Sequence, residues 1–226
     1  GSLYGLKTLR VNPENGQRVF LNGQGEEVQY NGLGKWTYLD GSTAKALSGD
    51  DFYVLGNALP KWYGGLTSNL RYRDIELNLN FTYAGGNYVM NRTKSTLTDQ
   101  IFFNNSTDIL RRWTTPGQVT DMPRVVNGDR ISFGGSTPIS EHVEKGDFLR
   151  LQNVSIAYNI PKKAIAFSQL NKVRVYGQIT NALLFTNYSG VDPEVSANGN
   201  SNTTPGVEYN TAGLGRTFTF GVNVTF

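Results

Sequence analysis

The chain has no cysteine and a single histidine, and these absences exclude several kinds of chemistry. Without Cys among its 226 residues it forms no disulfide, no thiolate nucleophile and no cysteine-based metal site. The one histidine, His142, has no carboxylates near it at the spacing of a zinc site or a catalytic triad. The sequence also nominates no pair of carboxylates for glycoside hydrolysis. We therefore expect a protein that is not an enzyme.

Long apolar runs and clustered positive charge are missing as well. No run of roughly 18 or more apolar residues occurs, so no transmembrane helix is expected. The 21 lysines and arginines are scattered along the chain, which argues against a nucleic-acid surface. What the chain does contain is 26 Gly, 12 Tyr and 12 Phe, a composition that favours strands and turns over helices.

The segment from Arg216 to Phe226 carries the clearest pattern in the chain. Apolar side chains occupy every second position from Phe218 onward, and Thr or Asn fill most positions between them. A period of two predicts a strand with one apolar and one polar face. Its length, about ten residues, is that of a tilted transmembrane β-strand, whose side chains face lipid and lumen in turn.

Four further strands follow from the same reasoning. Residues 62–72 and 75–83 alternate cleanly on either side of a tight turn at Arg73-Asp74, which predicts a hairpin. Residues 148–160 form the next strand, with a bulge where the parity slips between Leu151 and Val154. After one or two helical turns, residues 172–181 form another. The lipid-facing side chains of the second strand are predicted to be Ile75, Leu77, Leu79, Phe81 and Tyr83.

The connections between these strands alternate in length. Residues 73–74 and 161–171 are short, whereas 85–147 and 182–215 are long and rich in polar residues and glycine. Outer-membrane barrels have short periplasmic turns and long extracellular loops. We therefore predict an all-β fold, an antiparallel transmembrane β-barrel segment. Residues 12–61 become a third outer loop, and 3–11 a possible sixth strand. Five or six strands cannot close a barrel, since the smallest have 8.

Several stretches in order resemble one family, the SusC/RagA-type TonB-dependent receptors of the Bacteroidetes outer membrane. The segments Val11-Asn-Pro-Glu-Asn-Gly16 and Leu21-Asn-Gly-Gln-Gly25 resemble its turn-rich outer loop. Leu55-Gly-Asn-Ala-Leu-Pro-Lys-Trp-Tyr-Gly-Gly65 resembles the entry to a barrel strand, with Ala58 where proline is usual. The remaining matches are Trp113-Thr-Thr-Pro-Gly117, Met122-Pro-Arg124, Gly146 to Tyr158, Val173-Arg-Val-Tyr176, Thr180 to Gly190, Asp192-Pro-Glu194 and the terminal Phe.

The resemblance implies what the whole protein does. Residues 1–226 would be the C-terminal part of a plugged barrel of about 22 strands, with the plug and the first strands upstream. Such a receptor imports glycan or peptide fragments across the outer membrane. Its implied partners are a SusD-type surface lipoprotein, TonB through the upstream segment, and outer-membrane lipid. The last strand also resembles the signal read by the outer-membrane assembly machinery, on Phe218, Phe220, Val222, Val224 and Phe226.

Two interpretations stay open for the outer loops. Five aromatic residues there could contact a ligand or a partner, or could fill the loop interiors, and packing is the favoured alternative: Trp36, Tyr38, Phe102, Phe103 and Trp113. Asp192, Glu194, Asn198 and Asn200 place oxygen ligands in one loop that could hold Ca²⁺, although their spacing is not that of an EF-hand. No other cofactor is expected. The rival to the importer is a secreted or surface-attached soluble β-domain that binds carbohydrate.

Overall fold

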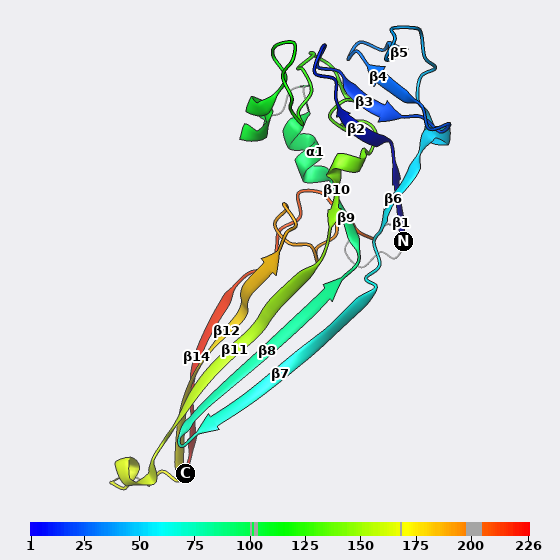
Figure 1. Cartoon of the computed structure of the whole chain (residues 1–226). Coiled ribbons are helices and arrows are strands. Elements are labelled where there is room, and N and C mark those ends of the chain that lie inside the picture. The colour runs from blue at the N-terminus through cyan, green and yellow to red at the C-terminus, as the bar shows by residue number, and fades with distance from the viewer. Residues whose placement is uncertain (100, 102–103, 168, 198–204) are drawn as a thin grey trace. The chain divides into compact units, whose positions relative to one another are not determined.

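The computed structural model describes all residues except 100, 102–103, 168 and 198–204, and it divides the chain into two compact units (Figure 1). One, the sheet unit, comprises residues 60–86, 146–194 and 212–226. The other, the loop unit, comprises residues 1–59, 87–145 and 195–211. The loop unit is therefore built from the connections that the sequence leaves between strands. No helix in the described part of the chain has the length and apolarity to cross a membrane.

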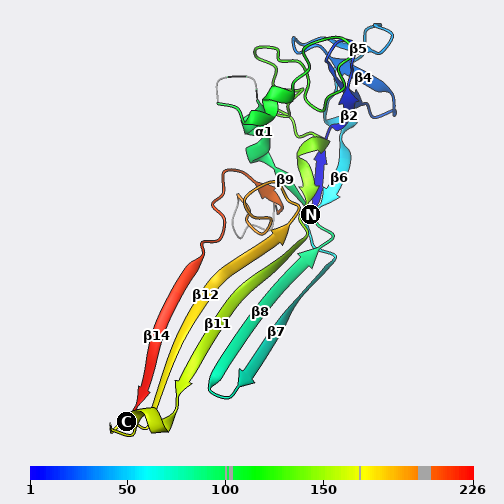
Figure 2. The ribbon, with the colours of Figure 1, turned by 60° about the vertical axis from the view of Figure 1, so that its left-hand side comes forward.

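The sheet unit is a single antiparallel sheet in the order β14-β12-β11-β8-β7. Both views show long, curved strands that run side by side (Figures 1 and 2). β7 and β8 form a hairpin in which Arg73 adopts a positive φ of 53°, the left-handed conformation that a tight turn requires. The strands are β7 (Trp62–Tyr72), β8 (Ile75–Gly85), β11 (Phe148–Ile160), β12 (Lys172–Thr186) and β14 (Thr217–Thr225).

The predicted bulge lies in β11, next to Gln152. Leu151 pairs with Phe81 of β8, but the next paired residue of β11 is Asn153, opposite Asn80. One residue of β11 is thus left over, and the parity of its apolar positions changes from odd to even there. Because a one-residue slip would turn every later side chain to the other face, the bulge keeps the apolar positions on one side.

The short connection from β11 to β12 contains one 3-10 turn, Lys162–Ile165, as the sequence predicts. It follows Pro161, whose ring removes a backbone donor and ends the strand. This turn lies at the same end of the sheet as the β7–β8 turn (Figures 1 and 2).

The loop unit has regular structure of its own. Its strands are β1 (Ser2–Gly5), β2 (Lys7–Val11), β3 (Arg18–Leu21), β4 (Glu27–Tyr30), β5 (Trp36–Tyr38), β6 (Tyr53–Asn57), β9 (Tyr88–Asn91), β10 (Val143–Lys145) and β13 (Val207–Glu208). Its helices are α1 (Arg92–Thr98) and 3-10 turns at Gly49–Asp51, Thr107–Arg111 and Ser140–His142. β2 to β5 form one sheet in sequence order, β1 pairs with β6, and β9 lies between β10 and β13.

The loop unit also has its own hydrophobic core. Phe20 and Trp36 lie with their ring centroids 5.3 Å apart, and Tyr30 contacts Trp36 at 4.8 Å. Leu6 and Ile139 join this cluster although they are far apart in sequence. The backbone N–H of Leu6 donates to Pro138, and that of Ser140 donates to Leu6. These bonds tie the first residues to the middle of the chain.

Two sequence expectations need correction here. Residues 85–147 are only partly irregular, because β9, α1 and β10 fall within them. Met90 of β9 and Val143 of β10 pack with Leu3 in a small hydrophobic cluster. Residues 3–11 are not a sixth strand of the sheet. They form β1 and β2, which pair with β6 and β3 inside the loop unit. The strand count of the sheet unit is therefore five.

Candidate membrane face and loop network

One face of the five-stranded sheet is apolar from edge to edge. Leu77 of β8 pairs with Ile156 of β11, and Val175 of β12 pairs with Val222 of β14. Paired residues point to the same side, so register carries each strand's apolar set onto a common surface. The predicted assembly-signal and lipid-facing residues lie on this surface together. Its other large members are Trp62, Leu66, Leu70, Tyr72, Leu149, Leu151, Val154, Tyr158, Ile160, Val173, Ile179, Leu183 and Phe185.

Much of this apolar face is open to solvent in the isolated chain. The exposed fraction is 61% for Leu66, 56% for Ile156 and 82% for Phe220. Soluble monomers rarely expose a contiguous apolar surface of this kind, because each buried CH₂ gains about 0.8 kcal/mol. The face therefore needs an apolar environment.

The opposite face is polar and internally hydrogen-bonded. Asn80 donates to Thr67 at 2.9 Å, and Asn78 donates to Asn69. Glu76 accepts from Asn159 at 3.0 Å and from Arg174 at 3.3 Å. A shallow hollow of about 490 Å³ lies over the hydrophilic residues of this face, among them Asn69, Arg71, Glu76, Asn78, Ser155, Arg174 and Gln178. A sheet with one apolar and one hydrated face suits the wall of a water-filled barrel.

The strands also have the length that a membrane requires. β7 and β8 each contain 11 residues. At about 3.3 Å per residue such a strand is roughly 36 Å long. A tilt of about 40° reduces its vertical span to roughly 28 Å, close to the apolar band of about 25 Å on outer-membrane barrels.

Aromatic side chains lie at both ends of the apolar face, as expected for membrane-interface girdles. Trp62 and Tyr83 meet at the loop end, with ring centroids 6.0 Å apart. Tyr72 and Tyr158 lie at the turn end, on either side of Ile75 in the register. Tyr188, just beyond the end of β12, is buried at 5% exposure and does not face a membrane in this conformation.

A buried ion cluster on the polar face was not foreseen from sequence. Arg150 of β11 is 3% exposed and donates to Asp192 at 2.7 Å and to Glu194 at 2.6 Å. Asp192 is equally buried, and the backbone N–H of Leu214 also donates to it. The cluster fixes the start of the β12–β14 connection against the sheet. The sequence offered one sign of this cluster, an arginine at a position of the polar face where most strands carry Thr, Asn or Ser.

This cluster bears on the calcium prediction. Two of the four predicted calcium ligands, Asp192 and Glu194, form ion pairs with Arg150. The other two, Asn198 and Asn200, lie outside the described residues. Among residues that the structure does describe, no group of three or more acidic or histidine side chains could hold a metal ion. A calcium site in this loop stays a prediction.

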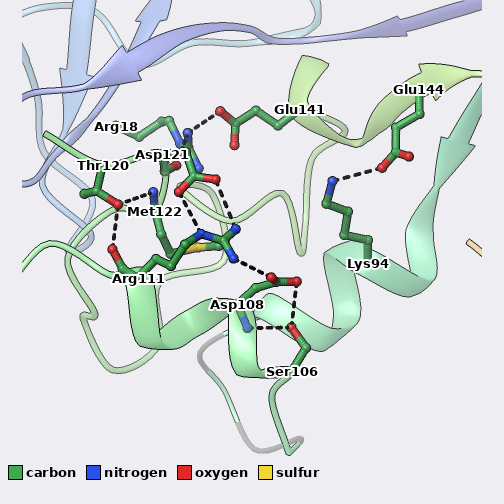
Figure 3. Close-up of polar contacts among 10 residues, drawn as sticks. All are labelled: Arg18, Lys94, Ser106, Asp108, Arg111, Thr120, Asp121, Met122, Glu141 and Glu144. Carbon is green, nitrogen blue, oxygen red and sulfur yellow. Dashed lines mark hydrogen bonds and ion pairs between the residues drawn. The ribbon is translucent and has the colours of Figure 1, made fainter. Parts of the chain in front are cut away.

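The loop unit contains a network of paired charges around a hollow of about 260 Å³ (Figure 3). Arg18 is buried at 2% exposure, pairs with Glu141 at 2.6 Å and donates to the carbonyl of Ser132. Burial lowers the pKa of Arg18, and the Glu141 carboxylate opposes that shift. Arg111 binds both Asp108 and Asp121, and its hydrogen bonds lower the pKa of both carboxyl groups.

His142 lines the same hollow. Burial lowers its pKa to about 3, helped by the positive charges of Lys94 and Arg18. The imidazole is therefore neutral near pH 7. Each cation that Figure 3 draws has an anionic partner, and Lys94 pairs with Glu144 at 2.9 Å. We interpret the network as one that holds the loops together.

The structure favours packing for the loop aromatics that it describes. Trp36 is 5% exposed inside the core, and Tyr38 packs against the same cluster. The indole N–H of Trp113 donates to the carbonyl of Pro13 at 2.8 Å, and its ring covers Gly16. Both tryptophans thus pack against other residues of the loop unit. Phe102 and Phe103 lie outside the described residues.

Comparison with known proteins shows which class of protein the chain is similar to. No protein-family model matches the chain. TonB-dependent receptor P3 of Formosa agariphila is 33% identical over 185 residues, 80% of this chain and 18% of that protein. TonB-dependent receptor SusC of Bacteroides thetaiotaomicron is 21% identical over 84% of this chain and 17% of its own length. A structure of the RagAB peptide transporter aligns with a TM-score of 0.75 at 21% identity, covering all of this chain and 23% of that one.

These relatives and the two-faced sheet define a class of outer-membrane β-protein. The chain belongs to the TonB-dependent receptors, and it is also similar to SusC and to a chain of the RagAB transporter. It spans only about a fifth of the length of the curated relatives that it matches, 18% of one and 17% of another.

The two faces of β8 predict opposite responses to a new charge. Leu79→Arg, near the middle of the apolar face, should lower the free energy of unfolding in phospholipid vesicles by about 2–4 kcal/mol. Asn78→Arg, on the polar face, should cost about 1 kcal/mol or less, mainly for its lost hydrogen bond. Urea unfolding of the intact receptor measures both. Equal losses for the two variants would show that the assignment of faces is wrong.

The buried cluster predicts a large effect of removing its cation. Arg150→Ala leaves Asp192 buried without its partner and should cost about 3–5 kcal/mol in urea unfolding of the intact receptor. Arg10→Ala is the matched control. It breaks a pair with Glu27 in which both side chains are partly exposed, and should cost about 1 kcal/mol or less. If Arg150→Ala is as mild as the control, the cluster does not stabilise the fold.

Proposed function

We propose that the chain is the C-terminal barrel segment of an outer-membrane TonB-dependent importer of nutrients. The observation that carries the proposal is the continuous apolar face, which extends over all five strands with a polar face behind it. A barrel wall is the arrangement that satisfies both faces at once, with lipid on one side and a hydrated lumen on the other.

The soluble carbohydrate-binding domain is a weaker explanation of the same sheet. A soluble sheet with one apolar face buries that face against a second layer. Here the apolar face includes Leu66, Ile156 and Phe220, which are largely exposed. The loop unit, which would have to supply such a layer, already has a core of its own around Phe20 and Trp36.

The cargo and partners of the whole protein are proposed by similarity. The cargo is a glycan or peptide fragment, and the RagAB complex, named as a peptide transporter, supports the peptide alternative. A SusD-type lipoprotein on the outer surface and TonB, reached through an upstream segment, are the proposed partners. The long connections of the sheet all leave from one end of its strands, which suits a loop region that faces such a lipoprotein.

Cell fractionation of the parent protein tests this proposal. We expect it in the outer-membrane fraction, with a band on SDS gels that migrates differently before and after boiling. Deleting its gene should then lower the uptake of labelled oligosaccharide or peptide pools, and the pool affected names the cargo class. A soluble protein whose mobility does not change on heating would contradict the importer and support the carbohydrate-binding domain.

The terminal aromatic residue predicts an assembly defect. Phe226 is 85% exposed and continues the apolar alternation of β14. Its deletion should reduce the amount of heat-modifiable receptor in the outer membrane, because the assembly machinery would lose part of its signal. Thr225→Ala changes a side chain on the polar face of the same strand. It is the control and should assemble normally. Normal surface levels after the deletion would refute the role of Phe226.

A further inference from the structure

Positive charge is concentrated at the turn end of the sheet unit. The connection between β11 and β12 carries Lys162 and Lys163, and β12 begins at Lys172. All three side chains are exposed. No acidic residue occurs between Asp147 and Asp192, so this hairpin has cations only. The neighbouring β7–β8 turn adds Arg71 and Arg73 to the same end of the sheet (Figures 1 and 2).

The acidic residues near this end do not neutralise the lysines. Glu76 accepts from Arg174 and from Asn159 on the polar face. Asp74 adjoins Arg73 in its own turn. The three lysines of the β11–β12 hairpin are therefore available to an anionic partner. With Arg174 counted, six cations face two carboxylates at this end, a formal charge of +4 against +3 for the whole chain.

The same connection exposes an aromatic side chain. Phe167 is 92% exposed, whereas Ile165, two residues earlier, is buried. The 3-10 turn Lys162–Ile165 thus directs one apolar side chain inward, and the next is left in solvent. Aromatic residues beside lysines at the end of an apolar face are the combination that anchors proteins at a membrane surface.

We propose that the described residues of the β11–β12 connection, 161–167 and 169–172, bind anionic phospholipid headgroups at the inner surface of the outer membrane. Lys162, Lys163 and Lys172 would contact phosphate, and the ring of Phe167 would lie at the interface. The surface adjoins the apolar face, which supports lipid over a protein partner. It belongs to a short connection, on the side opposite the long loops, which supports phospholipid of the inner leaflet. The proposal rests on the membrane placement under "Proposed function".

Lipid binding by the intact receptor tests this proposal. The receptor is purified in a neutral detergent and titrated with phosphatidylglycerol or phosphatidylcholine, and bound lipid is counted by native mass spectrometry. Each lysine near an anionic surface strengthens binding about 5-fold. The double variant K162Q/K163Q should therefore lose about 5- to 30-fold of its affinity for phosphatidylglycerol, and K162R/K163R should keep it.

The control variant removes two lysines from the loop unit. K35Q/K45Q carries the same change of charge at two exposed positions and should bind phosphatidylglycerol like the wild type. Phe167→Ser should weaken both lipids to a similar extent, since the ring does not distinguish headgroups. Raising the salt concentration should erase the difference between the wild type and K162Q/K163Q.

Three outcomes would overturn the proposal. One is a wild type that does not prefer phosphatidylglycerol to phosphatidylcholine. Another is an equal loss of affinity for phosphatidylglycerol in K162Q/K163Q and in the control K35Q/K45Q. The third is selective retention of lipopolysaccharide, which would place these lysines at the outer leaflet. The heat-modifiable band of each variant shows whether the lipid proposal alone has failed or the importer proposal as well. A membrane-embedded receptor without lipid preference contradicts only the lipid site, whereas a soluble protein contradicts both.

Discussion

The alternation of side chains across five strands is the constraint on which the sheet unit depends. Strand register transmits the apolar face from β7 to β14, so an error in one strand would place polar groups among apolar ones in its neighbours. In β11, the bulge at Gln152 keeps the apolar side chains on the common face although their parity changes there. Gln152 donates to Asn181 of β12 at 2.9 Å, and Asn181 has a positive φ of 53°. The irregular residues of the two strands thus satisfy each other.

Polar pairing on the second face complements this constraint. Side chains such as Asn80 and Thr67 lose little by facing one another, because this face is open to water, which can bind the groups that remain unpaired. Arg150 is different, because it is withdrawn from water and requires both Asp192 and Glu194. The pairing of Arg150 with Asp192 is therefore the place where the chain beyond β12 is fixed to the sheet. Hydrated pairs permit local adjustment, whereas the buried cluster does not.

The strands of the sheet were predictable from sequence because their signal is local. A period of two over ten residues needs no knowledge of distant parts, and even the bulge of β11 follows from a change of parity. The loop unit was not predictable in this way. Its core joins Leu6 to Ile139, and the backbone N–H of Thr8 donates to the hydroxyl of Ser140, 132 positions away. Such pairings leave no periodic trace, so the sequence shows only polar residues, glycines and isolated aromatics.

The loop aromatics and the buried cluster show the same limit at the level of single residues. Trp36 and Trp113 have the same appearance in sequence whether they bind a ligand or fill a core, and only their neighbours decide. Nothing in the sequence around Asp192 and Glu194 shows that both pair with Arg150, which lies 42 and 44 positions away.

The two ends of the sheet carry connections that differ in length and in composition. At one end the connections are long, and residues before β7 and between β8 and β11 form a core around Phe20 and Trp36. At the other end, the connections are short and carry lysine, arginine and exposed aromatic side chains. A short turn cannot build a core of its own, so most of its side chains stay exposed to the surroundings of the protein. Charge and aromatic rings are the groups that a membrane surface accepts, which is why the asymmetry of the connections and the asymmetry of the charge coincide.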